Sequence, residues 1–351
     1  MSDKSSLPPS EERSSTNDKK DHIRLCLDEN VESTQTTGFE RLYLINNPLP
    51  DIDFHNVDTA CTFLGKDISA PFVISPITGG YENSARINKN LARAAQELGV
   101  VMSVGSQRLG LEDDSLASTY QVREVAPNIP LLANLGAIYL NYDYGLKECE
   151  RAVDMIQADA LCLYLNPMQK IFQGPGNVNF KGLVEKIAFI CHHLSVPVIV
   201  KEVGFGLSAD AAVMLENAGV TMLDIAGAGG TSWTKITRFL KSDSQDDNSS
   251  CFDSWGIPTA DALIAVRSAV KEVPLIASGG IRTGIDIAKA LALGASYAGM
   301  ALPLVAPATK SARDVRLNIE RIIKELKIAM FSCGTITLDR LMQGQCISKK
   351  T

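Results

Sequence analysis

Residues 160–177 combine an apolar run with side chains that could do chemistry. Asn166, Gln169 and Lys170 follow the run ALCLYL directly, and Tyr164 lies within it. Amides donate and accept hydrogen bonds, a lysine ammonium can neutralise an anion, and a phenol can donate a proton. This group at the end of one predicted strand is typical of a site that handles a polar or charged ligand.

The ends of seven further apolar runs are also polar or rich in glycine. Lys201 ends a run that is otherwise apolar, so we expect its ammonium to point into the mouth of a site, beside a negative group. Any one such feature could be a plain turn or a solvated side chain, but their coincidence favours a binding site. The strand ends in question are Thr78, residues 106–108, Asn134, Lys201 with Glu202, and residues 227–233, 279–282 and 299–302.

Two glycine-rich stretches predict a phosphate site. They are ASGGIRTG at 277–284 and YAGMAL at 297–302, and they follow the last two apolar runs. Barrel enzymes often bind phosphate at this position through backbone N–H groups and a helix N-terminus. The remaining polar groups suit a ring system attached to that phosphate, and FMN fits, with Lys201 near the edge of the flavin ring.

The elements that must position these residues form a regular alternation. Eight short apolar runs begin near residues 71, 100, 130, 160, 197, 221, 274 and 297. Helical spacing of apolar residues marks the stretches 84–99, 180–194, 208–219, 259–272 and 284–294. Continuous apolar strands are typical of parallel sheets, so the pattern predicts an α/β fold of the (β/α)8 TIM-barrel type. A doubly wound sheet is the alternative, but the G-x-G-x-x-G turn expected after its first strand is absent.

Two segments lie outside the alternation. Residues 1–17 have the Ser, Pro and charged composition of a disordered tail, which leaves residues 18–351 as a single barrel domain. Residues 235–255 form a long polar and acidic connection, which is either a solvated flexible insert or a lid over the barrel mouth.

Composition limits the function classes. The net charge of -6 and the lack of a basic stripe argue against nucleic-acid binding. Eight scattered cysteines without a C-x-x-C indicate reduced thiols. No apolar stretch reaches the roughly 18 residues of a membrane span, and the polar start lacks a secretory signal. These features predict a cytoplasmic protein without a membrane partner.

Several strings together resemble one known family. GSQR at 105–108, LNPMQ at 165–169, GAGGTSW at 227–233, WGIPTA at 255–260 and FSCGT at 331–335 are similar to motifs of the type 2 isopentenyl diphosphate isomerases. These are FMN-dependent barrel enzymes that interconvert isopentenyl and dimethylallyl diphosphate by a flavin-assisted 1,3-proton shift. The resemblance implies NAD(P)H as the flavin reductant and a homo-oligomer, either a tetramer or an octamer.

The resemblance also implies roles for individual residues. Flavin contacts carried over are Thr78, Ser106, Asn134, Lys201, Thr231, Gly280, Arg282, Ala301 and Leu302. Contacts to the prenyl diphosphate substrate are Lys19, His22, Ser106, Gln107 and Arg108. The catalytic group is expected to be Gln169, Asn166, Tyr164 and Lys170.

The substrate side departs from the family pattern. Asp18 stands where the family has arginine, Tyr164 replaces a histidine, and Lys170 replaces the glutamate that ligates Mg2+. The string QGPGN at 173–177 has lost two carboxylates. Because Mg2+ prefers carboxylate and phosphate oxygens, we expect no metal ligands here, and Lys170 could neutralise a phosphate in place of the ion.

Three alternatives therefore remain open. The first is a divergent isomerase of isopentenyl diphosphate that is independent of metal or nearly so. The second is an FMN-dependent dehydrogenase, reductase or isomerase of another substrate in a specialised biosynthetic pathway, and the third is a flavin-binding or interaction protein without activity. The 2-hydroxy-acid oxidases, which are also FMN barrels, need an active-site histidine as base. The histidines here are His22, His55, His192 and His193, and the last two lie on a predicted outer helix.

Overall fold

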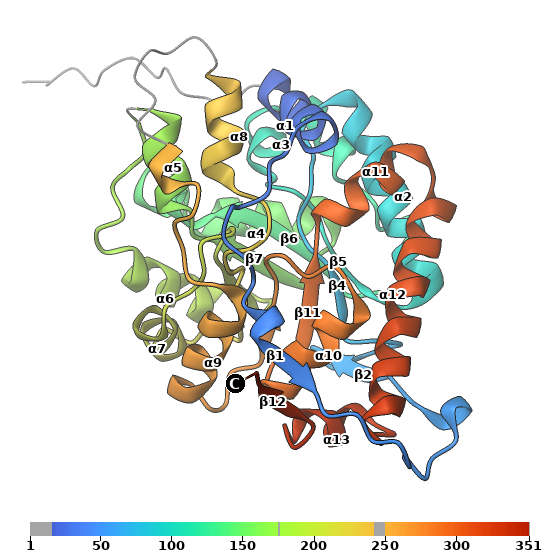
Figure 1. Cartoon of the computed structure of the whole chain (residues 1–351). Coiled ribbons are helices and arrows are strands. Elements are labelled where there is room, and N and C mark those ends of the chain that lie inside the picture. Colours follow the sequence, from blue (N-terminus) through green and yellow to red (C-terminus); the bar gives the residue numbers. More distant parts are fainter. Residues whose placement is uncertain (1–15, 175, 242–249, 351) are drawn as a thin grey trace, which may run out of the picture.

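The computed structural model describes residues 16–174, 176–241 and 250–350. Its centre is a closed parallel barrel with the strand order β10-β11-β4-β5-β6-β7-β8-β9. The predicted TIM-barrel fold is confirmed, and all eight predicted strands are present (Figure 1). The strands are β4 Phe72–Ile74, β5 Val101–Ser103, β6 Leu131–Gly136, β7 Ala160–Tyr164, β8 Val198–Lys201, β9 Met222–Asp224, β10 Leu275–Ala277 and β11 Tyr297–Met300.

Helices cover the outside of the barrel. Five of them coincide with the predicted amphipathic stretches: α2 Glu82–Leu98, α6 Leu183–His193, α7 Ala209–Asn217, α9 Thr259–Ala269 and α10 Gly284–Ala292. The outer layer also contains α4 Leu146–Ile156, α11 Leu302–Lys310 and the long α12 Ala312–Ser332. None of the helices among the described residues is long and apolar enough to cross a membrane.

Alternating strand residues divide the core in two. Val73, Leu132 and Cys162 point into the barrel, whereas their neighbours Phe72 and Leu131 pack against the helices. This alternation follows from the period of two in a β-strand. Both groups are apolar, which explains why the strands appear in the sequence as continuous apolar runs.

The amino-terminal end of the barrel is closed by a hairpin. Strands β2 Cys61–Phe63 and β3 Lys66–Ile68 pair antiparallel, and Phe63 packs edge-on against Tyr297 with ring centroids 4.8 Å apart. A second small sheet pairs β1 Leu42–Leu44 with β12 Ile347–Lys349, beside α13 Leu338–Met342. In the part of the chain that the structure describes, the hairpin thus closes the amino-terminal end of the barrel, while a cavity opens at its carboxyl-terminal end.

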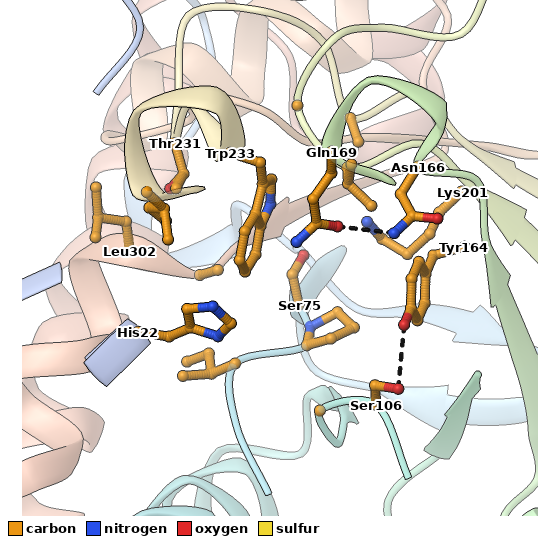
Figure 2. A pocket seen from close by; sticks show the side chains of 18 of the residues that line it. His22, Ser75, Ser106, Tyr164, Asn166, Gln169, Lys201, Thr231, Trp233 and Leu302 are labelled. Carbon is orange, nitrogen blue, oxygen red and sulfur yellow. Dashed lines mark hydrogen bonds between the residues drawn. The ribbon is translucent and has the colours of Figure 1, made fainter. Parts of the chain in front are cut away.

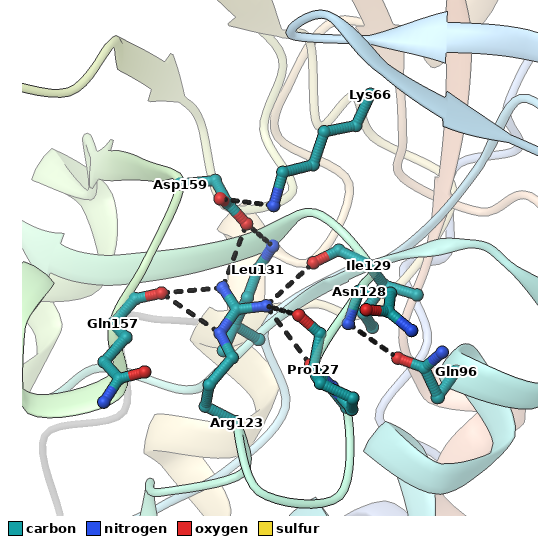
Figure 3. A network of polar contacts seen from close by, with 10 residues as sticks. Lys66, Gln96, Arg123, Pro127, Asn128, Ile129, Leu131, Gln157 and Asp159 are labelled. Carbon is teal, nitrogen blue, oxygen red and sulfur yellow. Dashed lines mark hydrogen bonds and ion pairs between the residues drawn. The ribbon is translucent and has the colours of Figure 1, made fainter.

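A polar network fixes two neighbouring strands at this lower end (Figure 3). The Asp159 carboxylate accepts from Lys66 Nζ at 2.6 Å, from Arg123 Nη2 at 3.0 Å and from the Leu131 N–H at 2.9 Å. Burial alone would raise the pKa of Asp159, but these donors lower it below its ordinary value. The network lies opposite the carboxyl ends of the strands, so we assign it to stability.

Four further helices lie at the other end, above the strand carboxyl ends (Figure 1). They are α1 Thr16–Asp28, α3 Arg108–Glu112, α5 Pro167–Gln173 and α8 Trp233–Leu240. Helix α8 contacts both α1 and α5. These elements surround the mouth of the barrel.

Two predicted boundaries need correction. Helix α1 begins at Thr16, so residues 16 and 17 do not belong to a tail, while residues 1–15 lie outside the described part. Residues 235–240 of the predicted long connection belong to α8, and Ser250–Phe252 forms a 3-10 helix. Ser232 caps α8 by accepting from the Lys235 N–H, and this cap could have been recognised in the sequence. The choice between insert and lid rests on residues 242–249, which are also outside the described residues.

Candidate active site

A cavity opens at the carboxyl ends of the strands, with an empty volume of about 1480 Å³ when its open mouth is included. Nearly all residues selected from the sequence line it: Lys19, His22, Ser106, Arg108, Asn134, Tyr164, Asn166, Gln169, Lys170, Lys201, Thr231, Gly280, Arg282, Ala301 and Leu302.

Gln107 and Thr78 are the exceptions, because neither lines the cavity. The fully buried Gln107 amide donates to the Ala152 carbonyl at 2.8 Å and accepts from the Asn134 N–H at 2.9 Å. The carbonyl of the buried Thr78 accepts from the Gly105 N–H at 3.0 Å. Both residues bond to cavity residues through these contacts, while the buried Thr78 hydroxyl has no hydrogen-bond partner among the described residues.

Three buried polar atoms of the cavity have no hydrogen-bond partner among the described residues. They are Ser75 Oγ, Asn134 Oδ1 and Asn166 Oδ1. An unsatisfied buried polar group costs about 1–3 kcal/mol, so these atoms point to a bound ligand that supplies the partner. Ser75 was missed in the sequence because it stands inside an apolar run, although it follows β4 directly.

Glycines allow the strands and loops at the floor of the cavity to pack closely against one another near Ser75. A Cβ on Gly299 would lie 2.6 Å from Ser75 Oγ and 2.9 Å from Ser278 Cβ, and a Cβ on Gly230 would lie 2.4 Å from the Gly280 nitrogen. Side chains at these two positions would push apart strands and loops that border the cavity. The absence of side chains lets the backbone approach a flat ligand closely.

Lys201 lies at the bottom of the cavity beside a buried acid, as the sequence predicted. Its ammonium donates to the Glu202 carbonyl at 2.5 Å and lies 4.0 Å from Asp224 Oδ2. Asp224 also accepts from Ser278 Oγ at 2.6 Å. Burial raises the pKa of Asp224 against the opposing charge of Lys201. The neighbouring Glu202 carboxylate turns away and accepts backbone N–H groups from the loop after β8.

The Asn166 and Gln169 amides lie at the start of helix α5, beside Lys201, because β7 and β8 are neighbouring strands. Pro167 occupies its first turn, where the missing N–H costs nothing. Asn166 Nδ2 donates to Gln169 Oε1 at 2.8 Å, and Figure 2 shows that the amide nitrogen of Gln169 is thereby turned into the cavity. Gln169 can therefore donate to a ligand while its oxygen stays occupied.

Tyr164 lies on the same wall, as the last residue of β7, the strand that precedes α5. Its hydroxyl donates to Ser106 Oγ at 3.2 Å (Figure 2). Burial raises the pKa of Tyr164, so the phenol stays protonated near neutral pH. It can act as a hydrogen-bond donor or as a weak acid, but not as a resident anion.

Three cations approach one another on the remaining side. Arg108 and Lys170 lie over the Tyr139 ring, at 5.5 Å and 5.0 Å from its centroid. Arg108 is also paired with Glu112 at 2.8 Å. Burial, together with the charges of Arg108 and Lys170, lowers the pKa of Lys19 to about 8, although Asp18 opposes the shift. This side of the cavity is therefore suited to an anion.

His22 lies next to this group but does not add to its charge. Its ring meets Trp233 edge-on at 5.3 Å between centroids. Burial and the neighbouring Lys19 lower the pKa of His22 to about 3, so its imidazole is neutral near pH 7 and weakly basic. His22 can hydrogen-bond a ligand but is poorly suited to abstract a proton. His192 and His193 are exposed at the end of the outer helix α6, as predicted.

The segment after α1 completes the cavity wall. Glu32 bridges to Thr231, and its carboxylate binds the Arg282 guanidinium at 2.5 Å. The Lys235 ammonium donates to the Glu32 carbonyl at 2.7 Å. Arg282 therefore lines the cavity as predicted, but in an ion pair that no sequence motif indicated.

The lowered pKa of Lys19 predicts a pH dependence for anion binding. The ammonium is charged below about pH 8 and neutral above it, so the affinity for inorganic pyrophosphate should fall as the pH rises from 7 to 9.5. A charge-assisted hydrogen bond is worth about 1.5–3 kcal/mol, which corresponds to roughly tenfold or more in affinity. Calorimetric titration would measure the fall. In a Lys19→Met variant, the remaining pH dependence of the affinity should be only that caused by the titration of pyrophosphate itself. A pH profile of this variant equal to that of the wild type would refute the role of Lys19.

Known proteins resemble this chain in sequence over nearly its whole length. Residues 22–118 and 173–348 match the sequence model of the FMN-dependent dehydrogenase family. The chain is 45% identical over 333 residues to an isopentenyl-diphosphate delta-isomerase of Nostoc sp., covering 94% of this chain and 95% of that protein. It is 46% identical over 328 residues to the Rickettsia peacockii protein of the same name, with 93% and 96% covered.

Solved structures support the fold. A mandelate oxidase variant with an FMN adduct superposes with a TM-score of 0.66 at 19% identity, covering 95% of this chain and 98% of that one. A lactate oxidase described as putative, from Pediococcus acidilactici, superposes with a TM-score of 0.63 at 18% identity, covering 90% and 85%. At these identities the likeness concerns the fold alone.

Proposed function

The chain belongs to the FMN-dependent, type 2 family of isopentenyl-diphosphate delta-isomerases, and from this premise we propose that it interconverts isopentenyl and dimethylallyl diphosphate. The observation that carries the proposal is the division of one cavity into two sides. Unsatisfied polar atoms and glycine backbone border one side, and three cations border the other. This division suits a flavin beside an anionic substrate.

The residues present fit FMN. Ser75 and Asn134 offer buried polar atoms that lack protein partners, and Gly299 leaves the backbone open to a flat ring. Helix α11 begins at Leu302, and the first-turn N–H groups of a helix can bind phosphate. The residues that would hold FMN are Ser75, Ser106, Asn134, Lys201, Thr231, Gly280, Arg282, Ala301 and Leu302.

When bound and reduced, the flavin supplies an electron-rich ring that can stabilise charge in a 1,3-proton shift, with NAD(P)H as its reductant. The chain's own groups bind and orient the substrate. Lys19 and Arg108 neutralise the diphosphate, and Gln169, held by Asn166, donates into the space between the two sides. Tyr164 retains its proton and closes the wall beside Ser106. As part of the same proposal, the protein assembles as a homo-oligomer, a tetramer or an octamer.

The proposal predicts turnover by the reduced holoenzyme. Isopentenyl diphosphate, incubated anaerobically with the enzyme and NADPH in D2O, should yield dimethylallyl diphosphate that carries deuterium, which proton NMR detects. No net oxidation of NADPH should accompany the product, because the shift is redox-neutral. Absence of product both with and without Mg2+ would contradict the proposal.

The departures at Tyr164 and Lys170 favour one second candidate, an FMN-dependent enzyme acting on a different substrate. Bleaching or reoxidation of the flavin by one compound of a substrate panel, without isomerisation, would support it. Oxidation of 2-hydroxy acids is a poor match, because the one histidine lining the cavity has a pKa of about 3 and is too weak a base.

A further inference from the structure

Lys170 is held in place by an aromatic residue from a different part of the barrel. Its ammonium donates to the Tyr139 hydroxyl at 3.1 Å and lies 5.0 Å from the centre of the same ring. Tyr139 belongs to the 3-10 helix Ala137–Asn141 that follows β6, while Lys170 belongs to α5 after β7. An aromatic face attracts a cation without neutralising its charge, so Tyr139 helps to hold the Lys170 ammonium in place.

The same ring orders a second cation. The Arg108 guanidinium lies 5.5 Å from the Tyr139 centroid, and Arg108 is buried. Lys19 reaches this place from α1. Three cations from α1, α3 and α5 therefore converge on one side of the cavity, and burial together with the charges of Arg108 and Lys170 lowers the pKa of Lys19. A multivalent anion would relieve that repulsion.

The cavity offers little to a divalent metal ion. Among the described residues, no three His, Cys, Asp or Glu side chains are grouped so that they could hold a metal. Mg2+ is usually bound through one or two carboxylates together with phosphate oxygens. The Glu112 carboxylate beside this group is already paired with Arg108.

From this arrangement we propose that Lys170, positioned by Tyr139, serves as a built-in cation for the substrate, so that an organic diphosphate binds to Lys19, Arg108 and Lys170 without a divalent metal. The inference deepens the proposed function, and rests on it for the diphosphate as ligand. A lysine ammonium acts on phosphate as a point charge. Lys170 would thus supply the charge that a metal ion supplies in other phosphate sites. Binding of the diphosphate would then need no added Mg2+.

The test compares affinities of the FMN-loaded enzyme with and without metal. Inorganic pyrophosphate and isopentenyl diphosphate are titrated in EDTA and in millimolar Mg2+, and binding is followed by calorimetry. For the wild type we expect dissociation constants that agree within about twofold in the two buffers. Lys170→Met should weaken both ligands by at least about tenfold in EDTA, the scale of one lost charge-assisted contact. Tyr139→Phe, which keeps the ring and removes the hydroxyl, should weaken them less.

Lys324→Met is the matched control, because Lys324 is exposed on α12 and lines no part of the cavity. It should bind within about twofold of the wild type. Flavin content and thermal unfolding are measured for every variant. If Lys170→Met loses either, Lys170→Gln takes its place with the same expectation.

The outcomes separate this inference from the proposed function. Pyrophosphate binding that requires Mg2+, or an unchanged affinity in the Lys170 variants, would overturn the inference even if isomerisation occurs. Metal-free pyrophosphate binding that depends on Lys170, together with no isomerisation, would support the inference and refute the proposed substrate. Isomerisation in EDTA that is lost with Lys170 would support both.

Discussion

Replacing Lys201 by alanine should leave the purified protein with less than about a tenth of the flavin bound by the wild type. Lys201 is the one buried lysine of the cavity floor, and its ammonium lies 4.0 Å from Asp224 Oδ2. Its removal deletes the positive charge proposed to face the flavin and leaves a buried carboxylate without its ion pair. Removing one partner of a buried pair costs about 3–5 kcal/mol of stability.

The two effects of Lys201→Ala can be separated with a second variant. Lys201→Met combined with Asp224→Asn removes both charges, and Ser278 can still donate to the amide oxygen. We expect this double variant to recover most of the lost stability, measured by thermal or urea unfolding, but not the flavin content, measured from the visible absorbance. Isomerase activity should be lost in both. Flavin content equal to the wild type in either variant would remove Lys201 from the flavin site.

Replacing Gln169 by leucine should lower kcat by about 10²- to 10³-fold with little change in flavin content. The reason is geometric: the Gln169 amide nitrogen points into the cavity, while its oxygen is occupied by Asn166 at 2.8 Å. Groups that transfer or position a proton typically contribute 10²–10⁴-fold. Anaerobic assays with pre-reduced enzyme measure the chemical step.

Two further variants sharpen the Gln169 prediction. Gln169→Glu keeps the size and the oxygen facing Asn166 but exchanges the donor for a carboxylate, so we expect a similar loss. Asn166→Ala leaves Gln169 in place but removes its orienting bond and the unsatisfied Asn166 Oδ1 acceptor, and should cost roughly tenfold. Gln121→Leu, at an exposed position outside the cavity, is the control. A loss of less than threefold in Gln169→Leu would show that its donor is not used.

The barrel itself could be derived from the sequence because its signals are local. Each strand is a short apolar run between polar turns, and the helices show their amphipathic spacing within a few turns. A closed parallel barrel then places all strand ends at one face, which is why residues as distant as Asn134, Lys201 and Leu302 could be assigned to one cavity before their positions were known. The family motifs extended the same reasoning to individual ligand contacts.

Local patterns did not reveal which polar side chains face the cavity. Gln107 and Ser106 are neighbours in one motif, yet Ser106 lines the cavity and Gln107 is buried behind it with both ends of its amide bonded. Ser75 looked like part of an apolar run and proved to be an unsatisfied polar group of the floor. Side-chain direction depends on the tilt of each strand within the closed barrel. A motif of a few residues does not specify that tilt.

The sequence by itself determined the barrel, the glycine-rich strand ends and the loss of acidic groups around Lys170, because these depend on residue type and on short-range periodicity. Only the tertiary structure decided how the charges act. The proximity of Lys19, Arg108 and Lys170, the pairing of Arg282 with Glu32 and the neutral state of His22 depend on side chains brought together from helices far apart in the chain. Electrostatic interaction varies with separation and burial, and both are properties of the folded molecule.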